Sequence, residues 1–146
     1  MIKEILALNN KSIQFVNGMA ANDPVSTLQI WQFVIERYSS IDCTCVFFNS
    51  REDRPFRTNQ MIELTLREIK PDHFIVRGDK VSSTIQKLIH YSPDTSIYEV
   101  PLDDSHENVI KFIGQMPQNT LIYAIGNQVG AGQEILEIIS AYRNYG

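Results

Sequence analysis

The chain has 146 residues, of which 43% are hydrophobic and 21% are charged, a composition typical of one globular domain. With a formal charge of −4 and no basic run, the chain lacks the signature of a nucleic-acid-binding protein. No apolar stretch approaches the roughly 20 residues that cross a bilayer, and we expect the first eight residues, which are too short and too acidic, not to be a secretory signal.

Residues 1–11 are predicted to be a linker or the end of a helix from an absent upstream domain, and 12–146 to be one domain. Within that domain, β-rich runs alternate with runs of helical spacing. The predicted strands are 12–16, 41–48, 73–76, 97–100 and 121–125. The predicted helices are 24–39, 58–69, 81–90, 104–113 and 132–142. This alternation predicts a Rossmann-like three-layer α/β/α domain with a mostly parallel sheet of five or six strands.

Apolar residues on the first predicted helix recur at helical spacing, which predicts that this helix packs on the sheet. They are Leu28, Trp31, Val34, Ile35 and Tyr38. The only two cysteines, Cys43 and Cys45, lie two apart in a β-rich run, so their side chains share one face. We expect both to pack in the core, because no second pair or nearby histidine completes a metal site.

Three polar segments follow predicted strands at the edge where open α/β sheets bind ligands. They are 17–27, 49–58 and 126–132. The first combines small residues with a helix start at Asn22, Asp23 and Pro24, which favours an anion but is also an ordinary capped turn. The last is a glycine-rich turn and by itself a weak signal.

The second segment holds Arg51, Arg54 and Arg57 within seven residues of a net acidic chain. Arginine forks bind carboxylate or phosphate groups with two parallel hydrogen bonds. The alternative is a solvated loop in which these arginines pair with Glu52 and Asp53, an arrangement that contributes little at a surface.

Other catalytic signatures are missing from the sequence. The chain has no Gly-Lys-Ser/Thr phosphate loop and no G-x-G-x-x-G dinucleotide pattern, so we expect it not to split ATP alone. His73, His90 and His106 lie in different elements without ligands at metal spacing, and we expect them to be structural or exposed.

The polar segments resemble the C-terminal domain of the poly-γ-glutamate (capsule) synthase ligase subunit, the CapB/PgsB type of the Mur ligase superfamily. The resemblance begins with segment 15–31, which reads FVNGMAANDPVSTLQIW. It continues through the Asn-x-Arg-x-Asp-Arg-x-x-Arg-Thr pattern at 49–58 and through IYAIGN at 122–127, followed by Gly130. It covers nearly the whole chain.

This resemblance implies a Mur-ligase-type C-terminal domain at 12–146 that closes over the substrates of an ATP-dependent acid–amino acid ligase. Such a ligase joins glutamates through their γ-carboxyl groups by way of an acyl phosphate. It implies ATP and magnesium held mainly by a missing central ATPase domain, which would leave the isolated domain inactive. The implied partners are that domain, glutamate, poly-γ-glutamate and membrane-bound capsule synthase subunits, at the cytoplasmic face of the membrane.

The resemblance also implies roles for individual residues. Arg51, Asp53 and Arg54 are the implied catalytic residues, on a stretch that contacts phosphate or substrate carboxylate in relatives. The implied substrate- or nucleotide-binding residues are Asn17, Asn22, Asp23, Ser26, Asn49, Arg57, Gly126 and Asn127. Asn17 stands where Mur ligases generally carry an aspartate that reaches ATP, and asparagine lacks its charge. No metal ligand is implied within this chain.

Two other functions fit the sequence. A stand-alone nucleotide-binding regulatory module would bind adenine nucleotides at micromolar concentration without further domains. A pure interaction domain would expose Trp31 and Tyr38, whereas the helical spacing predicts that they face the sheet.

Overall fold

The computed structural model describes residues 3–8, 11–21, 23–38, 40–51, 53–104 and 106–142. The strands are β1 (Lys3–Leu8), β2 (Lys11–Asn17), β3 (Cys43–Asn49), β4 (His73–Arg77), β5 (Ser96–Val100) and β6 (Thr120–Gly126). They form one six-stranded sheet in the order β1-β2-β6-β3-β4-β5. All neighbours pair in parallel except β1, which is antiparallel to β2.

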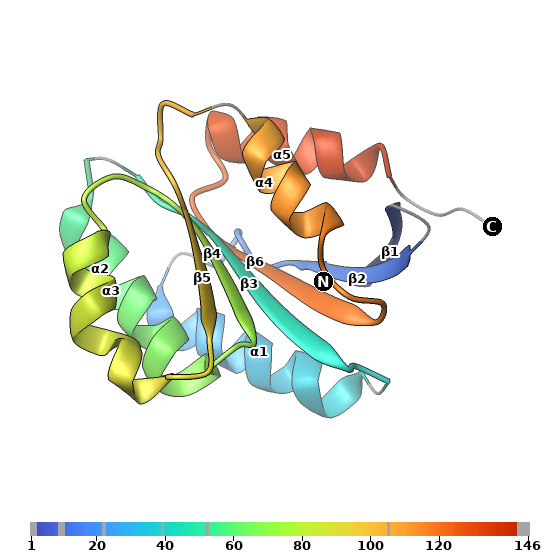
Figure 1. Ribbon diagram of the computed structural model, residues 1–146, viewed down its shortest axis with the longest axis horizontal. Helices are drawn as coiled ribbons and strands as arrows, with labels where there is room; N and C mark the ends of the chain where they lie inside the picture. The colour runs from blue at the N-terminus through green and yellow to red at the C-terminus, as the bar shows by residue number, and fades with distance from the viewer. Residues whose placement is uncertain are drawn as a thin grey trace.

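Helices cover both faces of this sheet, as Figure 1 shows. The helices are α1 (Pro24–Arg37), α2 (Pro55–Leu64), α3 (Ser82–Leu88), α4 (His106–Gly114) and α5 (Ala131–Ser140), with a π-helical turn η1 (Thr65–Ile69) and a 3₁₀ turn η2 (Ile89–Tyr91). One face carries α1, α2 and α3, and the other carries α4 and α5. The predicted three-layer α/β/α architecture with a mostly parallel sheet is therefore confirmed.

Each face of the sheet has its own apolar core, because successive strand residues point to opposite faces. Phe47 and Ile122 point toward α4 and α5, where they pack with Ile113 and Ile135. On the opposite face, the buried side chains include Val46, Phe74, Leu121 and Tyr123. Strands buried on both faces are typical of parallel sheets and explain the continuous apolar runs in the sequence.

The expectation of a linker or helix end at residues 1–11 is wrong for Lys3–Leu8, which forms β1. It pairs with β2 from Lys3 opposite Val16 to Leu8 opposite Lys11. The Ala7 main-chain N–H also donates to the carbonyl oxygen of Tyr142 at 2.9 Å. A short apolar run does not distinguish strand from helix by periodicity, and pairing with β2 satisfies the open edge of the sheet.

The second predicted helix, 58–69, differs from the structure at both ends. It begins earlier, at Pro55, because proline is well placed in the first turn of a helix. It then changes to the π-helical turn η1, in which the Thr65 hydroxyl donates to the Met61 carbonyl oxygen at 2.9 Å. Lys70 ends the turn in the left-handed conformation, with φ of 52°.

The first helix packs on the sheet through Trp31, which is 8% exposed and stacks on Tyr123 with ring centroids 5.6 Å apart. Tyr38 is partly buried against the same core. These positions confirm the sheet-facing stripe and do not fit an interaction domain with both aromatics exposed. Ile35 is an exception, since it is 41% exposed while Val34 faces the core.

Both cysteines are free thiols. Cys45 is buried between β3 and the α4–α5 layer, as expected, whereas Cys43 is only half-buried at the start of β3. Within the described ranges, none of the helices is long and apolar enough to span a membrane.

Candidate functional site

A cavity of about 770 Å³ lies beyond the carboxyl ends of β2, β3 and β6. The sheet register brings these ends together, since Asn49 pairs with Gly126 and Asn17 with Ala124. All three polar segments contribute to its walls. The lining includes Met19, Ala21, Asn49, Arg51, Arg54, Arg57, Met61, Gly126 and Asn127. The structure thus brings together segments that are far apart in the sequence, as predicted.

Arg51 and Asp53 form an ion pair at the edge of this cavity. The Nε and Nη2 groups of Arg51 donate to Oδ1 and Oδ2 of Asp53, each at 3.0 Å. The arginine holds the pKa of the Asp53 carboxyl below its ordinary value, chiefly through these side-chain hydrogen bonds. Both side chains are exposed, so the pair contributes little to stability. Glu52, the other expected pairing partner, lies outside the described residues.

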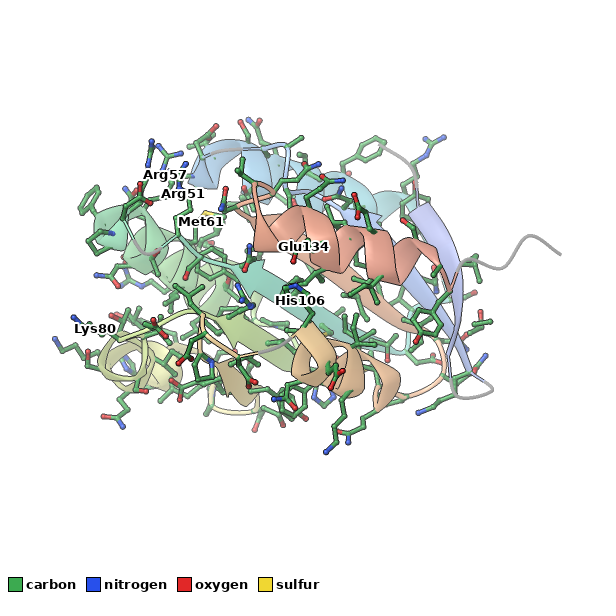
Figure 2. All side chains as sticks on the ribbon, turned by 90° about the horizontal axis from the view of Figure 1, so that it is seen from above. Arg51, Arg57, Met61, Lys80, His106 and Glu134 are labelled. Atoms are coloured by element: carbon green, nitrogen blue, oxygen red, sulfur yellow. The ribbon has the colours of Figure 1, made fainter. Side chains whose placement is uncertain are left out.

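Two further arginines come from the start of α2. Arg54 is the residue that caps the helix, and its carbonyl oxygen accepts the first intrahelical bond, from Thr58 N–H at 3.0 Å. Arg57 lies in the first helical turn, and both arginines line the cavity. Figure 2 shows Arg51 and Arg57 at the same end of the molecule, close to Met61. Three cationic side chains therefore face one cavity of a net acidic chain.

Asn17 does not line the cavity. It is exposed at the end of β2, and its Oδ1 accepts a hydrogen bond from Met19 N–H at 3.0 Å. Met19, Ala20 and Ala21 of this turn line the cavity. In the structure, Asn17 shapes the turn that carries lining residues, and its direct contact with a nucleotide stays a prediction.

Asp23 and Ser26 cap the start of α1. Asp23 Oδ1 accepts from Ser26 N–H at 2.8 Å, and Oδ2 accepts from the Ser26 hydroxyl at 2.9 Å. These bonds, with a smaller contribution from nearby Arg57, lower the pKa of Asp23. Neither Asp23 nor Ser26 lines the cavity, and Asn22 lies outside the described residues.

Asn49 and Asn127 join the ends of β3 and β6. Asn127 N–H donates to the Asn49 carbonyl oxygen at 2.7 Å, and Asn49 Nδ2 donates to the Asn127 carbonyl oxygen at 2.8 Å. Gly126 between them has φ of +98°, and a Cβ there would lie 2.4 Å from the Asn49 carbonyl oxygen. Only glycine adopts this positive φ readily and has no Cβ to clash with the Asn49 carbonyl oxygen, so the turn after β6 needs Gly126.

The lining of the cavity is chemically suited to an anionic ligand. Arginine guanidinium groups on one wall suit phosphate or carboxylate oxygens. Met19 and Met61 also line the cavity, although both side chains are almost fully buried in the core. Among the described residues, no group of three or more His, Cys, Asp or Glu side chains is arranged to hold a metal ion.

Two features of this region were not predicted. Arg77 at the end of β4 is a buried residue, and it donates to Asn49 Oδ1 at 3.2 Å. His106 and Glu134 join α4 to α5, with Nε2 and Oε2 2.5 Å apart, and they face one another in Figure 2. For Arg77 a signal existed, because it directly continues the buried run 73–76 at the ligand-binding edge. The pairing of His106 with a residue 28 positions away has no local signal.

Comparison with known proteins identifies relatives over nearly the whole chain. Residues 2–142 match the model of the family described as poly-gamma-glutamate synthase CapB C-terminal domain. The chain is 32% identical over 133 residues to PGA synthase CapB of Bacillus subtilis (strain 168), covering 88% of this chain and 33% of that protein. It is 31% identical over 140 residues to the capsule biosynthesis protein CapB of Bacillus anthracis, covering 89% of this chain and 28% of that protein. The chain thus spans about a third of these relatives.

Among solved structures, a murein peptide ligase Mpl from Psychrobacter arcticus 273-4 superimposes with a TM-score of 0.62 at 13% identity. The superposition covers 94% of this chain and 29% of that one. At this identity the similarity establishes a shared fold.

Proposed function

The chain belongs to the poly-gamma-glutamate synthase CapB C-terminal domain family, and on that premise we propose that it closes the active site of an ATP-dependent ligase. The proposed ligase extends a poly-γ-glutamate chain by forming an amide bond between the terminal γ-carboxyl group and the amino group of an incoming glutamate. The observation that carries this proposal is the wall of Arg51, Arg54 and Arg57 on a cavity at the switch point of the sheet.

The chemistry explains why such a wall suits this reaction. A carboxylate is a poor acceptor for an amine, and ATP supplies the phosphoryl group that activates it as an acyl phosphate. The amino nitrogen of glutamate then attacks the acyl carbon, the C–O bond to phosphate breaks with its electron pair, and the nitrogen releases a proton. Negative charge is present on both substrates and increases on the acyl oxygen during attack.

The three arginines of the cavity would stabilise this negative charge. Arg54 and Arg57 line the cavity at the start of α2, where they would stabilise the phosphate oxygens and the developing oxyanion. Arg51 stands at its edge with its fork oriented by Asp53. The turn at Gly126 and Asn127 forms another wall of the cavity.

The remaining machinery is proposed to lie in the part of the ligase outside this chain. The sequence has no phosphate loop, and among the described residues no three His, Cys, Asp or Glu side chains are grouped to hold a metal ion. We therefore assign ATP, magnesium and the phosphoryl transfer mainly to a central ATPase domain. On this proposal the domain works in the cytoplasm beside membrane-bound capsule synthase subunits and is inactive when isolated.

Substitution of the arginines in the full-length ligase tests the proposal. Arg51→Ala and Arg54→Ala should each lower kcat/KM for polymer extension about 100-fold, the range for loss of one transition-state donor, without changing the melting temperature. Arg37→Ala at the far end of α1 is the matched control and should retain full activity. Unchanged polymer synthesis in both site variants would refute the assignment.

Calorimetric titration of the isolated chain with ATP separates this function from a stand-alone regulatory module. The ligase domain should show weak or undetectable binding, because most ATP contacts belong to the absent domain. A micromolar dissociation constant would favour the regulatory module instead.

A further inference from the structure

Arg77 is buried at the edge of the candidate site without contacting a carboxylate closely. Its side chain is 4% exposed, a degree of burial that arginine rarely reaches unless it is paired. Nη2 donates to the carbonyl oxygen of Leu102 at 2.6 Å and lies 3.5 Å from that of Asp104. Nη1 donates to Asn49 Oδ1 at 3.2 Å, whereas the buried Nε has no hydrogen-bond partner.

The charge of Arg77 is retained despite this burial. Removal from water lowers the pKa of its guanidinium, and the nearby carboxylates of Asp104, Asp79 and Glu134 act in the opposite direction. A guanidinium cannot be deprotonated in a folded protein, so the side chain always donates and never accepts a hydrogen bond.

Because the Arg77 guanidinium can only donate hydrogen bonds, it determines the orientation of the Asn49 side-chain amide. An asparagine amide has an acceptor oxygen at one end and a donor nitrogen at the other, and its two orientations are nearly equal in shape. Because Arg77 can only donate, it requires Oδ1 of Asn49 to point toward β4. The amide nitrogen must then point toward β6, where it donates to the Asn127 carbonyl oxygen at 2.8 Å. Asn49 is 1% exposed, so its amide depends on these two protein partners rather than on bulk water.

The turn held in this way forms one wall of the cavity. Residues 126–130 all line it, and the carbonyl oxygen of Asn127 lies against Gly132 at the start of α5. Arg77 lines a smaller adjoining cavity of about 250 Å³, which shares Asn49, Arg51 and Asn127 with the first. The side chain of Arg77 therefore connects the end of β4 with the walls of both cavities.

We propose that Arg77 is a positioning residue for the anion cavity, acting through Asn49 on the turn at 126–130. This inference rests on the proposed ligase function for its consequence in catalysis. The hydrogen-bond mechanism itself can be measured on the chain alone. The positioning role of Arg77 and the ligase function can therefore be refuted independently.

Hydrogen exchange of the chain, followed by NMR, tests the mechanism with three substitutions of graded chemistry. Arg77→Lys keeps a donor-only group, Arg77→Gln allows either orientation of Asn49, and Arg77→Met offers no donor. Exchange at the Asn127 amide should therefore accelerate least in the lysine variant and at least tenfold in the methionine variant. Amides of β2 paired with β6 should keep their protection.

Asn49→Asp tests whether general unfolding, rather than the loss of one hydrogen bond, causes the faster exchange at Asn127. The added carboxylate keeps and strengthens the contact with Arg77, but it replaces the amide donor facing the Asn127 carbonyl oxygen with an acceptor. We expect a loosened turn with an unchanged or higher melting temperature. Arg67→Met is the control, because it makes the same substitution at an arginine on η1 that pairs with Glu63 and does not line the cavity.

In the full-length ligase, Arg77→Met and Asn49→Asp should each raise KM for the polyanionic acceptor about tenfold, whereas Arg67→Met should leave KM unchanged. Unaltered exchange at Asn127 in both Arg77→Met and Asn49→Asp would overturn the positioning role. Accelerated exchange with normal polymer synthesis would retain the hydrogen-bond mechanism and reject the ligase assignment of the cavity.

Discussion

Arg51 and Asp53 meet through two parallel hydrogen bonds of 3.0 Å at the edge of the cavity, although both side chains remain exposed to solvent. The carboxylate orients the arginine and also competes with any anionic ligand for the same two donors. An exposed pair of this kind has a small interaction energy, so a phosphate or carboxylate group can displace Asp53.

Asp53→Asn should tighten anion binding by the chain, because it removes a negative charge from beside the ligand. We expect the dissociation constant for inorganic triphosphate, measured by NMR titration at low salt, to fall about 3- to 10-fold. The difference should shrink at high salt. Glu68→Gln, on η1, carries the same change of net charge and should have no effect. Equal affinities for Asp53→Asn and the unsubstituted chain would show that Arg51 does not contact the anion.

Acid should weaken the start of α1 through Asp23. The Ser26 hydrogen bonds lower the pKa of Asp23 below its ordinary value of 3.8. A carboxyl group with a lowered folded pKa stabilises the protein above its unfolded pKa, and this contribution is lost as pH falls through the folded pKa. Asparagine caps helices about as well but does not titrate. The melting temperature of Asp23→Asn should therefore be lower than that of the unsubstituted chain at pH 7, with the gap closing below about pH 3.8.

Thermal unfolding followed by circular dichroism between pH 7 and pH 2.5 measures this gap. Asp103→Asn, an exposed aspartate outside the helix caps of the described chain, is the matched control and should show no pH-dependent difference. A constant gap for Asp23→Asn across the range would contradict the role of the carboxylate charge.

The two thiols should react at very different rates. Burial raises the pKa of Cys45 far above its ordinary value, and partial burial raises the pKa of Cys43 to a smaller extent. The thiolate is the reactive form, so at pH 8 a disulfide reagent such as DTNB should modify Cys43 slowly and Cys45 only after unfolding. Cys43→Ser should abolish the slow reaction of the native protein with DTNB and leave one thiol that reacts in denaturant. Rapid modification of two thiols in the native protein would contradict this arrangement.

Removal of the Tyr123 hydroxyl should destabilise the domain. This buried hydroxyl donates to the Thr27 carbonyl oxygen at 2.9 Å, which ties β6 to α1. Tyr123→Phe removes this buried hydrogen bond between β6 and α1, and we expect a loss of about 1–2 kcal/mol in the free energy of unfolding. Urea unfolding monitored by Trp31 fluorescence measures it, since Trp31 stacks on this ring. Tyr91→Phe, which removes a hydroxyl bonded at the exposed surface to Arg67, should cost less.

The layered fold could be predicted from the sequence because periodicity reports which faces of strands and helices are apolar. The order of strands in the sheet could not, since nothing in segment 120–126 indicates that it enters between β2 and β3. The strand at residues 3–8 was not predicted, because an apolar run this short fits a helix or a strand equally well.

The candidate site was predicted at the level of segments and less well at the level of side chains. Parallel strands end at one edge, which was enough to bring 49–58 and 126–132 together. Local hydrogen bonds then decide where each polar side chain points, and for Asn17 and Asp23 the partners lie within three residues. Arg77 was missed because a charged residue at a strand end is usually solvated, and its burial depends on Leu102 and Asn49, which are distant in sequence.

Strand β6, which lies between β2 and β3 in the sheet, is also the last strand along the described residues. Before β6 is in place, β2 pairs only with β1, and β3 pairs only with β4, so the sheet consists of two separate parts. Once residue 119 has been synthesised, Arg51, Arg54 and Arg57 are all present, but the strand that joins the two parts of the sheet is not. Completion of this domain during synthesis must await almost its entire length, and a nascent chain stalled earlier would present two open sheet edges to chaperones.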